Sequence, residues 1–249
     1  MILELDVGNT RIKWRRKSMI GDEVIADGVF PDENEFLSAS LRHEKPQVFR
    51  FSSVRSQLLT ERLVSWSCKH WNLEPLIAKV SRKCGGVTVN YPDVSRLGVD
   101  RWLALLAGYK IASGACVIVD CGTAFTLDSI ANTGNHLGGY ILPGLALTRQ
   151  SLEANTSISL SAEAIYSSIA LGNSTDEAVL NGSLAALVAL VEKEVAKLKA
   201  LEGSCRLIFT GGDAGLLKDS SKFICSELVP SLVLDGLDIA CPSHQVPSQ

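Results

Sequence analysis

Two segments of the sequence place an aspartate at the end of an apolar stretch and a glycine two residues later: Asp6 with Gly8, and Asp120 with Gly122. Glycine lets the backbone approach a ligand closely, successive N–H groups can point at phosphate oxygens, and the carboxylate can hold Mg²⁺ or its water shell. One copy alone is equally well explained as an ordinary turn. Two copies favour a site for a nucleoside triphosphate, to which the nearby Lys13 could offer an ammonium group, unless it is simply a solvated charge.

An acidic and a basic residue, Asp100 and Arg101, stand side by side just before an apolar, helix-like stretch. An aspartate at this position is most often a helix N-cap. Phosphorylation of an alcohol, however, needs a carboxylate that accepts the hydroxyl proton and a cation that positions an anionic substrate. Arginine suits a substrate carboxylate because its guanidinium can donate two parallel hydrogen bonds. The pair is therefore a candidate for general-base catalysis and substrate binding.

The elements that must position these residues include both strands and helices in each half of the chain, and we expect an α/β fold. The expected strands are Ile2–Asp6, Arg11–Arg15, Val24–Phe30, Gln47–Phe51, Ala115–Val119, Phe125–Ala131 and Arg206–Phe209. The expected helices are Glu33–Leu41, Gln57–Trp71, Arg101–Ala112 and Thr175–Leu201. Because the opening strand and turn recur 114 residues later, we expect a duplicated fold with halves 1–112 and 113–249.

Composition excludes several classes of protein. The chain has 249 residues, of which 46% are hydrophobic and 20% charged, as in ordinary globular proteins. With a net charge of −3 it lacks the broad cationic surface that binds nucleic acid. No stretch is apolar enough to span a membrane, and the seven scattered cysteines indicate reduced thiols. We therefore expect a cytoplasmic protein with neither a nucleic-acid nor a membrane partner. The four histidines are widely separated, so a zinc site is not expected.

Five segments in this order resemble the type III pantothenate kinase family. They are Asp6–Lys13 (DVGNTRIK), Leu97–Arg101 (LGVDR), Asp120–Asp128 (DCGTAFTLD), Gly138–Gly144 (GGYILPG) and Thr210–Asp213 (TGGD). The family belongs to the acetate/sugar kinase, heat-shock chaperone and actin superfamily, so the resemblance implies two RNase H-like halves with ATP bound in the cleft between them. It further implies that the chain phosphorylates pantothenate to 4′-phosphopantothenate, the first step of coenzyme A biosynthesis.

The resemblance also implies roles for individual residues. Asp100 is the general base, Asp120 is associated with K⁺ or NH₄⁺, Mg²⁺ accompanies ATP, and Thr210–Asp213 lies by the adenosine. The implied ATP-binding residues are Asp6, Val7, Gly8, Asn9, Thr10, Arg11, Ile12, Lys13 and Thr123. The implied pantothenate-binding residues are Tyr91, Gly98, Val99, Asp100, Arg101 and Thr175. Tyr91 could equally be an aromatic residue packed on the surface, and Thr175 could be the N-cap of the helix that it begins. Asp128 could share a face of the sheet with Asp120 or be solvated, and we assign it no role.

A homodimer with shared active sites is the expected assembly, because the resemblance implies that Thr175 reaches the pantothenate site of the partner subunit. The helix that it begins carries a ridge of apolar residues, which suits either the internal core or a two-fold contact. The ridge consists of Leu184, Leu187, Val188 and Val191.

Two other functions stay open from the sequence. Proteins of this family have been described as transcription accessory factors, so the chain could be a nucleotide-binding regulatory protein without kinase activity. The intact pair Asp100 and Arg101 argues against this. A related kinase or phosphatase with another small acceptor is the other possibility.

Overall fold

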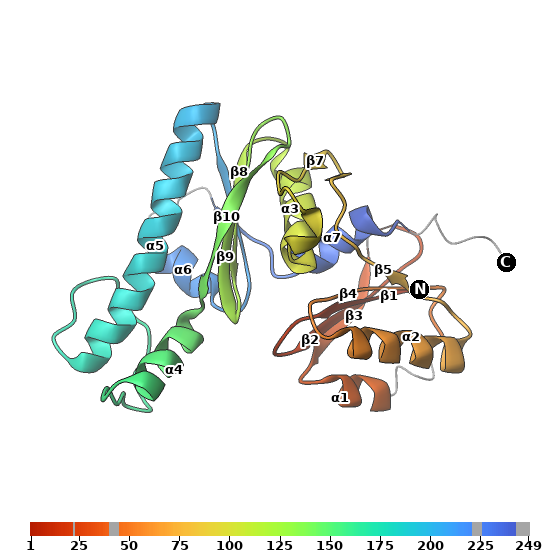
Figure 1. The fold of residues 1–249 in the computed structure, drawn as a ribbon, viewed down its shortest axis with the longest axis horizontal. Helices are drawn as coiled ribbons and strands as arrows, with labels where there is room; N and C mark the ends of the chain where they lie inside the picture. The colour runs from red at the N-terminus through yellow and green to blue at the C-terminus, as the bar shows by residue number, and fades with distance from the viewer. Residues whose placement is uncertain (22, 40–44, 221–225, 243–249) are drawn as a thin grey trace. The chain divides into compact units, whose positions relative to one another are not determined.

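The computed structural model describes the whole chain except residues 22, 40–44, 221–225 and 243–249 (Figure 1). The chain forms two compact units. The first contains Met1–Ala107 together with the C-terminal helix α7 (Leu232–Ala240), and the second contains Gly108–Ser231. The division thus falls inside helix α3 (Val99–Ala112), a few residues before the predicted boundary, and α7 joins the first unit instead of the second.

The first unit is built on a five-stranded sheet in the order β3-β2-β1-β4-β5. Its strands are β1 (Ile2–Val7), β2 (Ile12–Lys17), β3 (Val24–Phe30), β4 (Val48–Ser53) and β5 (Leu76–Ile77). β1 pairs antiparallel with β2 and parallel with β4, and β2 pairs antiparallel with β3. Helices α1 (Glu33–Ser38) and α2 (Gln57–Trp71) contribute Phe36, Leu59, Leu63 and Trp71 to the core beside β1 and β4. The short pair β6 (Lys83–Cys84) and β7 (Val87–Thr88) and the 3₁₀ turn η2 (Val94–Arg96) precede α3.

The second unit repeats this plan with the order β10-β9-β8-β11-β12. Its strands are β8 (Cys116–Cys121), β9 (Ala124–Ile130), β10 (His136–Pro143), β11 (Arg206–Thr210) and β12 (Ser226–Leu228). Its helices are α4 (Leu145–Asn155), α5 (Thr175–Glu202) and α6 (Ala214–Ser220). β8 pairs antiparallel with β9 and parallel with β11, as β1 does with β2 and β4. The predicted duplication is therefore confirmed, and Asp6 and Asp120 occupy the same position, the last but one residue of β1 and β8.

Helix α7 packs on the first sheet through charged groups. Arg50, which is 1% exposed, donates to both Glu4 and Asp238, and Lys17 donates to Asp238 at 2.6 Å. Arg15 donates to Glu4 at 2.5 Å and to Asp235. Three cations thus meet three carboxylates under one helix. Helix α7 also packs against α3. Gly236 of α7 lies so close to Leu103 of α3 that a Cβ at Gly236 would lie 2.3 Å from the carbonyl oxygen of Leu103, so the two helix backbones are in contact.

The apolar ridge of α5 lies in the core of the second unit. Leu184, Leu187, Val188 and Val191 are all buried there against β8, β9 and β11. The ridge therefore gives no support to a two-fold contact, and of its two possible roles the internal one is correct. No described helix combines the length and the apolar character that crossing a membrane requires.

Candidate active site

The first of the two predicted phosphate-binding turns, called the first phosphate loop below, is the turn between β1 and β2. The N–H of Gly8 donates to the carbonyl of Arg11 at 3.1 Å, which closes the turn. Asp6 lies directly opposite Lys13 in the β1–β2 pair, so both side chains are on one face of the sheet. The Asp6 carboxylate also accepts a hydrogen bond from the Ser52 hydroxyl at 3.2 Å. A carboxylate and an ammonium therefore stand together at the base of the loop.

Two of the predicted ATP-binding residues have side chains that cannot serve a ligand. Val7 and Ile12 are completely buried in the core of the first unit, so only their backbone could contribute. The side chains of Asn9, Thr10 and Arg11, by contrast, are exposed at the tip of the loop.

Arg55, which sequence reasoning missed, binds this loop from β4's end. Its Nε donates to the carbonyl of Gly8 and its Nη2 to the carbonyl of Asn9, both at 2.8 Å. A single arginine before a helix carries no recognisable sequence signal, and only the parallel pairing of β1 and β4 brings it to the loop.

The second predicted phosphate-binding turn, called the second phosphate loop below, is tighter because it has only Gly122 and Thr123 between β8 and β9. A Cβ at Gly144 would lie 2.4 Å from the carbonyl oxygen of Gly122, and the Gly144 N–H donates to the carbonyl of Thr123 at 3.0 Å. Gly211 has φ of 95° and a Cβ there would lie 2.5 Å from Oδ1 of Asp120. Glycines from two of the recognised motifs thus enclose the loop where any side chain would collide with it.

The segment Thr210–Asp213 is joined to this loop by backbone contacts. The N–H of Asp213 donates to the carbonyl of Cys121 at 3.0 Å. Burial, together with the negative charges of Asp120 and Asp213, raises the pKa of the Cys121 thiol far above its usual range. Cys121 is therefore a neutral, buried group with the carboxylates of Asp120 and Asp213 nearby.

Asp100 lies in the first turn of α3, which begins at Val99, so it is not the N-cap of that helix. Its Oδ1 accepts the N–H of Arg101 at 2.7 Å. A Cβ at Gly98 would lie 2.6 Å from the same oxygen, so glycine makes room for the carboxylate. The guanidinium of Arg101, which is 7% exposed, donates to the Tyr91 hydroxyl at 3.2 Å. The structure thus brings Tyr91, Gly98, Asp100 and Arg101 together.

Asp128 and Thr175 have different surroundings from these groups. Asp128 is buried and lies 2.9 Å from Nε2 of His136, which is also buried, so it is part of an internal pair. Thr175 is exposed, and the N-cap of α5 is Ser174, whose hydroxyl accepts from the N–H of Glu177 at 3.2 Å. Thr175 is therefore not engaged as a cap.

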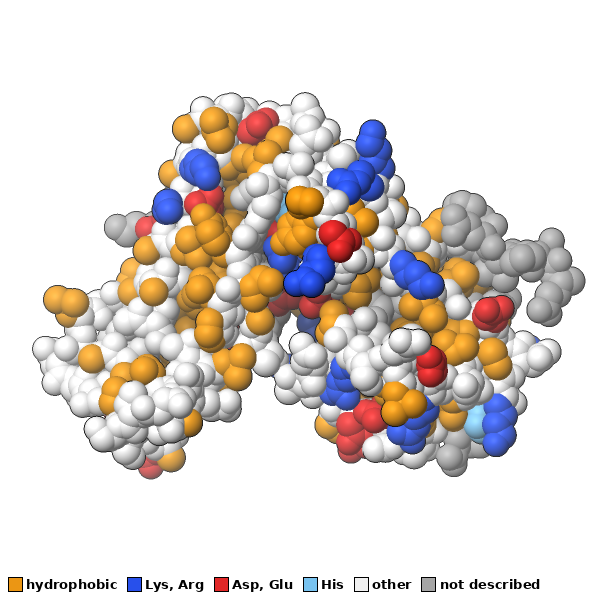
Figure 2. Space-filling model, viewed as in Figure 1, with side chains coloured by type: hydrophobic (Ala, Val, Ile, Leu, Met, Phe, Trp, Pro, Cys, Tyr) orange, Lys and Arg blue, Asp and Glu red, His pale blue; other side chains and the backbone are white. Residues whose placement is uncertain are grey.

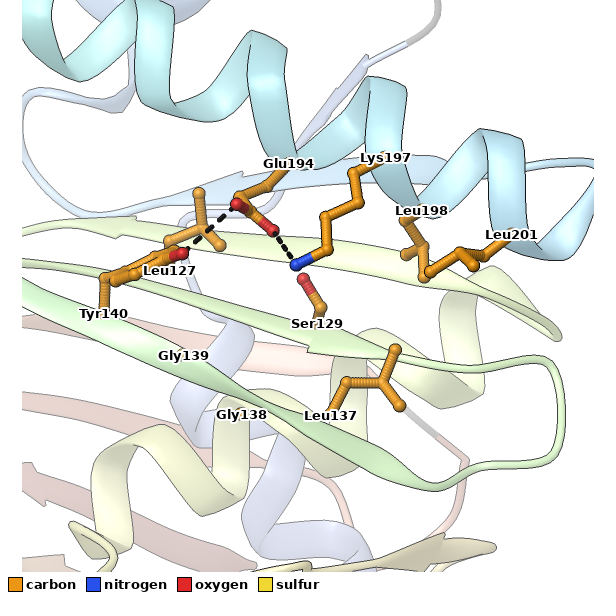
Figure 3. Close-up of a pocket in the computed structure, with 10 residues that line it drawn as sticks. All are labelled: Leu127, Ser129, Leu137, Gly138, Gly139, Tyr140, Glu194, Lys197, Leu198 and Leu201. Carbon is orange, nitrogen blue, oxygen red and sulfur yellow. Dashed lines mark hydrogen bonds and ion pairs between the residues drawn. The ribbon is translucent and has the colours of Figure 1, made fainter.

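A cavity of about 290 Å³ between α5 and strands β9 and β10 contains none of the predicted site residues. Figure 3 shows its polar groups: Tyr140 donates to Oε1 of Glu194 at 3.2 Å, and Lys197 lies 3.5 Å from Oε2. Both oxygens of this carboxylate already have a partner. The cavity therefore supplies no argument for a phosphate or pantothenate site.

Comparison with known proteins identifies the family. The family model described as type III pantothenate kinase matches residues 2–197. The type III pantothenate kinase of Ectopseudomonas mendocina (strain ymp) is 42% identical over 251 residues, covering 97% of this chain and 99% of the relative. The chain belongs to the type III pantothenate kinase family. It is thus a kinase that phosphorylates pantothenate with ATP in coenzyme A biosynthesis, as the sequence predicted.

Solved structures support the fold. A conserved putative Baf family transcriptional activator from Campylobacter jejuni superposes with a TM-score of 0.65 at 23% identity, covering 95% of each chain. A putative 2-dehydro-3-deoxygalactonokinase from Sinorhizobium meliloti superposes with a TM-score of 0.52 at 12% identity, covering 96% of this chain and 97% of the other. These likenesses confirm the predicted α/β fold.

Kinases of this kind use a divalent metal with ATP. Among the described residues, no group of three His, Cys, Asp or Glu side chains could hold a metal ion. The single carboxylate of Asp6 at the end of β1 nevertheless fits a divalent metal, since such an ion can take one carboxylate and keep substrate phosphates and waters as its other ligands.

Proposed function

We propose that Asp100 is the general base of pantothenate phosphorylation and that Arg101 binds the pantothenate carboxylate. Asp100 accepts the hydroxyl proton as the hydroxyl oxygen bonds to the γ-phosphorus and the bond to ADP breaks. The observation that carries the proposal is the buried Arg101, held by Tyr91 directly beside Asp100. Gly98 and Val99 complete this surface with their backbone. Such an arrangement positions a carboxylate-bearing alcohol against the base.

The experiment that tests this function measures ADP release with and without pantothenate, and identifies the product by mass spectrometry. We expect release to require pantothenate and the product to be 4′-phosphopantothenate. Pantothenate-independent hydrolysis, or transfer to another small acceptor only, would contradict the proposal.

For ATP, we propose binding by Asp6–Lys13 and by Thr123. The support is the pairing of Asp6 with Lys13 and the exposed, glycine-enclosed position of Thr123. Mg²⁺ bound to the phosphates would neutralise charge on the transferring group. Asp120 is the proposed ligand of a monovalent K⁺ or NH₄⁺, which offsets the negative charge that it shares with Asp213. Replacing potassium by sodium is expected to lower the rate. Equal rates in the two salts would show that the reaction does not depend on a bound monovalent ion.

A homodimer in which Thr175 contacts the partner's pantothenate site is also proposed. Hydrophobic side chains gather on the face of the second unit drawn in Figure 2. Ile165, Ile169 and Leu171 precede Thr175 in the chain and are 74%, 43% and 97% exposed. Exposed apolar residues of this kind suit a subunit contact. Mixing Asp100→Asn with Thr175→Arg tests it: active mixtures support shared sites, and inactive mixtures after confirmed subunit exchange contradict them.

The alternative is a nucleotide-binding transcription accessory protein without kinase activity. The solved neighbour from Campylobacter jejuni carries a transcriptional title, which describes that protein. The Asp100–Arg101–Tyr91 arrangement favours the kinase, because a nucleotide sensor needs no general base. The cytoplasmic location stays a prediction from the cysteine content.

A further inference from the structure

Arg55 connects the first phosphate loop to the start of helix α1. Its side chain is 22% exposed, and Nε and Nη2 bond to the consecutive carbonyls of Gly8 and Asn9, each at 2.8 Å. Its third nitrogen, Nη1, lies 3.2 Å from Oε2 of Glu33, the first residue of α1. Arg62 approaches the other oxygen of Glu33 at 3.6 Å. The guanidinium is therefore held in place while it binds the loop.

These two bonds decide which way the loop's peptide groups face. In a trans peptide the carbonyl and the following N–H point in opposite directions, and the described chain has no cis peptide bond. Because the carbonyls of Gly8 and Asn9 point to Arg55, the N–H groups of Asn9 and Thr10 are directed to the opposite side of the loop. Two successive N–H groups facing one side form the kind of concavity that binds anions.

The two bonds from Arg55 are added to the backbone bond that closes the turn. The backbone bond that closes the turn joins Gly8 to Arg11, and the side chains of Asn9 and Thr10 are exposed. Glycine permits several backbone conformations at the start of the loop. A peptide flip would turn a carbonyl dipole toward the phosphates, which is repulsive.

We propose that Arg55 is a positioning residue for the triphosphate: it orients the N–H groups of Asn9 and Thr10 toward the phosphates without itself touching the nucleotide. This inference rests on the proposed function, in that the first loop binds ATP. Glu33 holds Arg55 in turn. The N–H donors are then already oriented before ATP binds, so binding does not include the free-energy cost of ordering them.

The test compares Arg55→Met and Arg55→Lys with the matched control Arg62→Met. Arg62 also lies beside Glu33 and is 50% exposed, but it makes no bond to the loop in the described structure. Dissociation constants for ATP and for adenosine are measured by calorimetry, and KM for both substrates by ADP release. Thermal unfolding shows whether each variant is folded.

For Arg55→Met we expect an ATP dissociation constant and KM raised about 10- to 100-fold, because two charge-assisted bonds that hold the donors are lost. The adenosine dissociation constant and the KM for pantothenate should stay within about twofold of wild type, since neither ligand uses the loop's N–H groups. Arg62→Met should be unchanged in all four. Lysine cannot reproduce the fork that spans both carbonyls, so Arg55→Lys should remain within a few-fold of Arg55→Met.

Three results would overturn the role of Arg55. Wild-type ATP affinity in folded Arg55→Met would mean that the loop does not need the two hydrogen bonds from Arg55 to bind ATP. Full restoration by Arg55→Lys means that only a positive charge near the phosphates matters. Equal losses for adenosine, pantothenate and ATP mean general destabilisation. A wild-type protein that fails to release ADP with pantothenate would instead contradict the proposed function, so the two failures are distinguishable.

Discussion

One pair of facing residues has a different chemical character in each of the two sheets. In the first sheet, Glu4 of β1 lies opposite Arg50 of β4, and in the second sheet Ile118 of β8 lies opposite Ile208 of β11. All four side chains are buried. The ionic pair is covered by the acidic residues of α7, whereas the aliphatic pair is covered by α3, where a Cβ at Gly108 would lie 2.5 Å from Ile118.

The same strand order therefore tolerates two kinds of interior. A buried ionic cluster must recover the cost of desolvation through its partners, so the loss of one partner is expensive. An aliphatic contact loses only the area and volume that are removed. We infer that at this position the stability of the first unit depends on charge and that of the second unit on packing.

The largest expected effect comes from Arg50→Met. It leaves Glu4 and Asp238 each without one of their partners and should lower the free energy of unfolding by about 3 to 5 kcal/mol. The equivalent change in the second sheet, Ile208→Val, should cost only about 0.5 to 1.5 kcal/mol. Urea denaturation of both variants measures the difference. Equal decreases in the free energy of unfolding would contradict the expected difference between the ionic and the aliphatic pair.

A smaller effect is expected at the glycines that begin the two phosphate loops. A Cβ at Gly8 would lie 3.2 Å from the carbonyl oxygen of Arg11, and one at Gly122 would lie 3.1 Å from Oδ1 of Asp120. Valine should therefore distort either loop and weaken ATP binding about 10- to 100-fold, the cost of one lost hydrogen bond to a phosphate.

Calorimetric titration with ATP measures this, and Gly182→Ala is the control because nothing lies within 4 Å of a Cβ there. Unchanged affinity in both folded valine variants would exclude the two-loop site. A loss of ATP affinity in only one of the two valine variants would show that the two loops contribute unequally to ATP binding.

The smallest effect concerns pH. Burial opposes ionisation of Asp238, but Lys17 and Arg50 hold the pKa of its carboxyl below the usual 3.8. A lowered pKa means that the carboxylate stabilises the fold above about pH 3.8 and that this contribution is lost as the pH falls through the folded-state value. Asp238→Asn should cost about 1 to 2 kcal/mol at pH 7, less than a fully buried pair because the side chain is 29% exposed.

The gap between wild type and Asp238→Asn should shrink as the pH is lowered from 5 to about 3. Chemical denaturation across this range checks it, with the exposed Glu192→Gln as control. A gap that stays constant with pH would show that Asp238 contributes by shape or hydrogen bonding and not by charge.

Much of this architecture could be predicted from the sequence because local patterns carried it. The helix Gln57–Trp71 and the strand Val24–Phe30 have the predicted bounds, and the strand-Asp-x-Gly repeat revealed the duplication. Strand β10 was not expected, since Gly138 and Gly139 interrupt its pattern with residues that are poor strand formers.

Contacts between residues far apart in the chain could not be predicted from the sequence. Nothing local indicates that α7 returns to the first unit, because its partners Arg15 and Arg50 are about two hundred positions away in the chain. Arg55 was missed for the same reason. The individual site residues came from the family's motifs, and their roles stay predictions that only function can test.

The most direct test of the account is Asp100→Asn. The amide keeps the size of the side chain and can still accept the N–H of Arg101, but it cannot take up the hydroxyl proton. We predict a fall in kcat of about 10² to 10⁴, with the ATP dissociation constant nearly unchanged. Retention of more than about a tenth of the wild-type kcat would contradict the assignment of Asp100 as the general base.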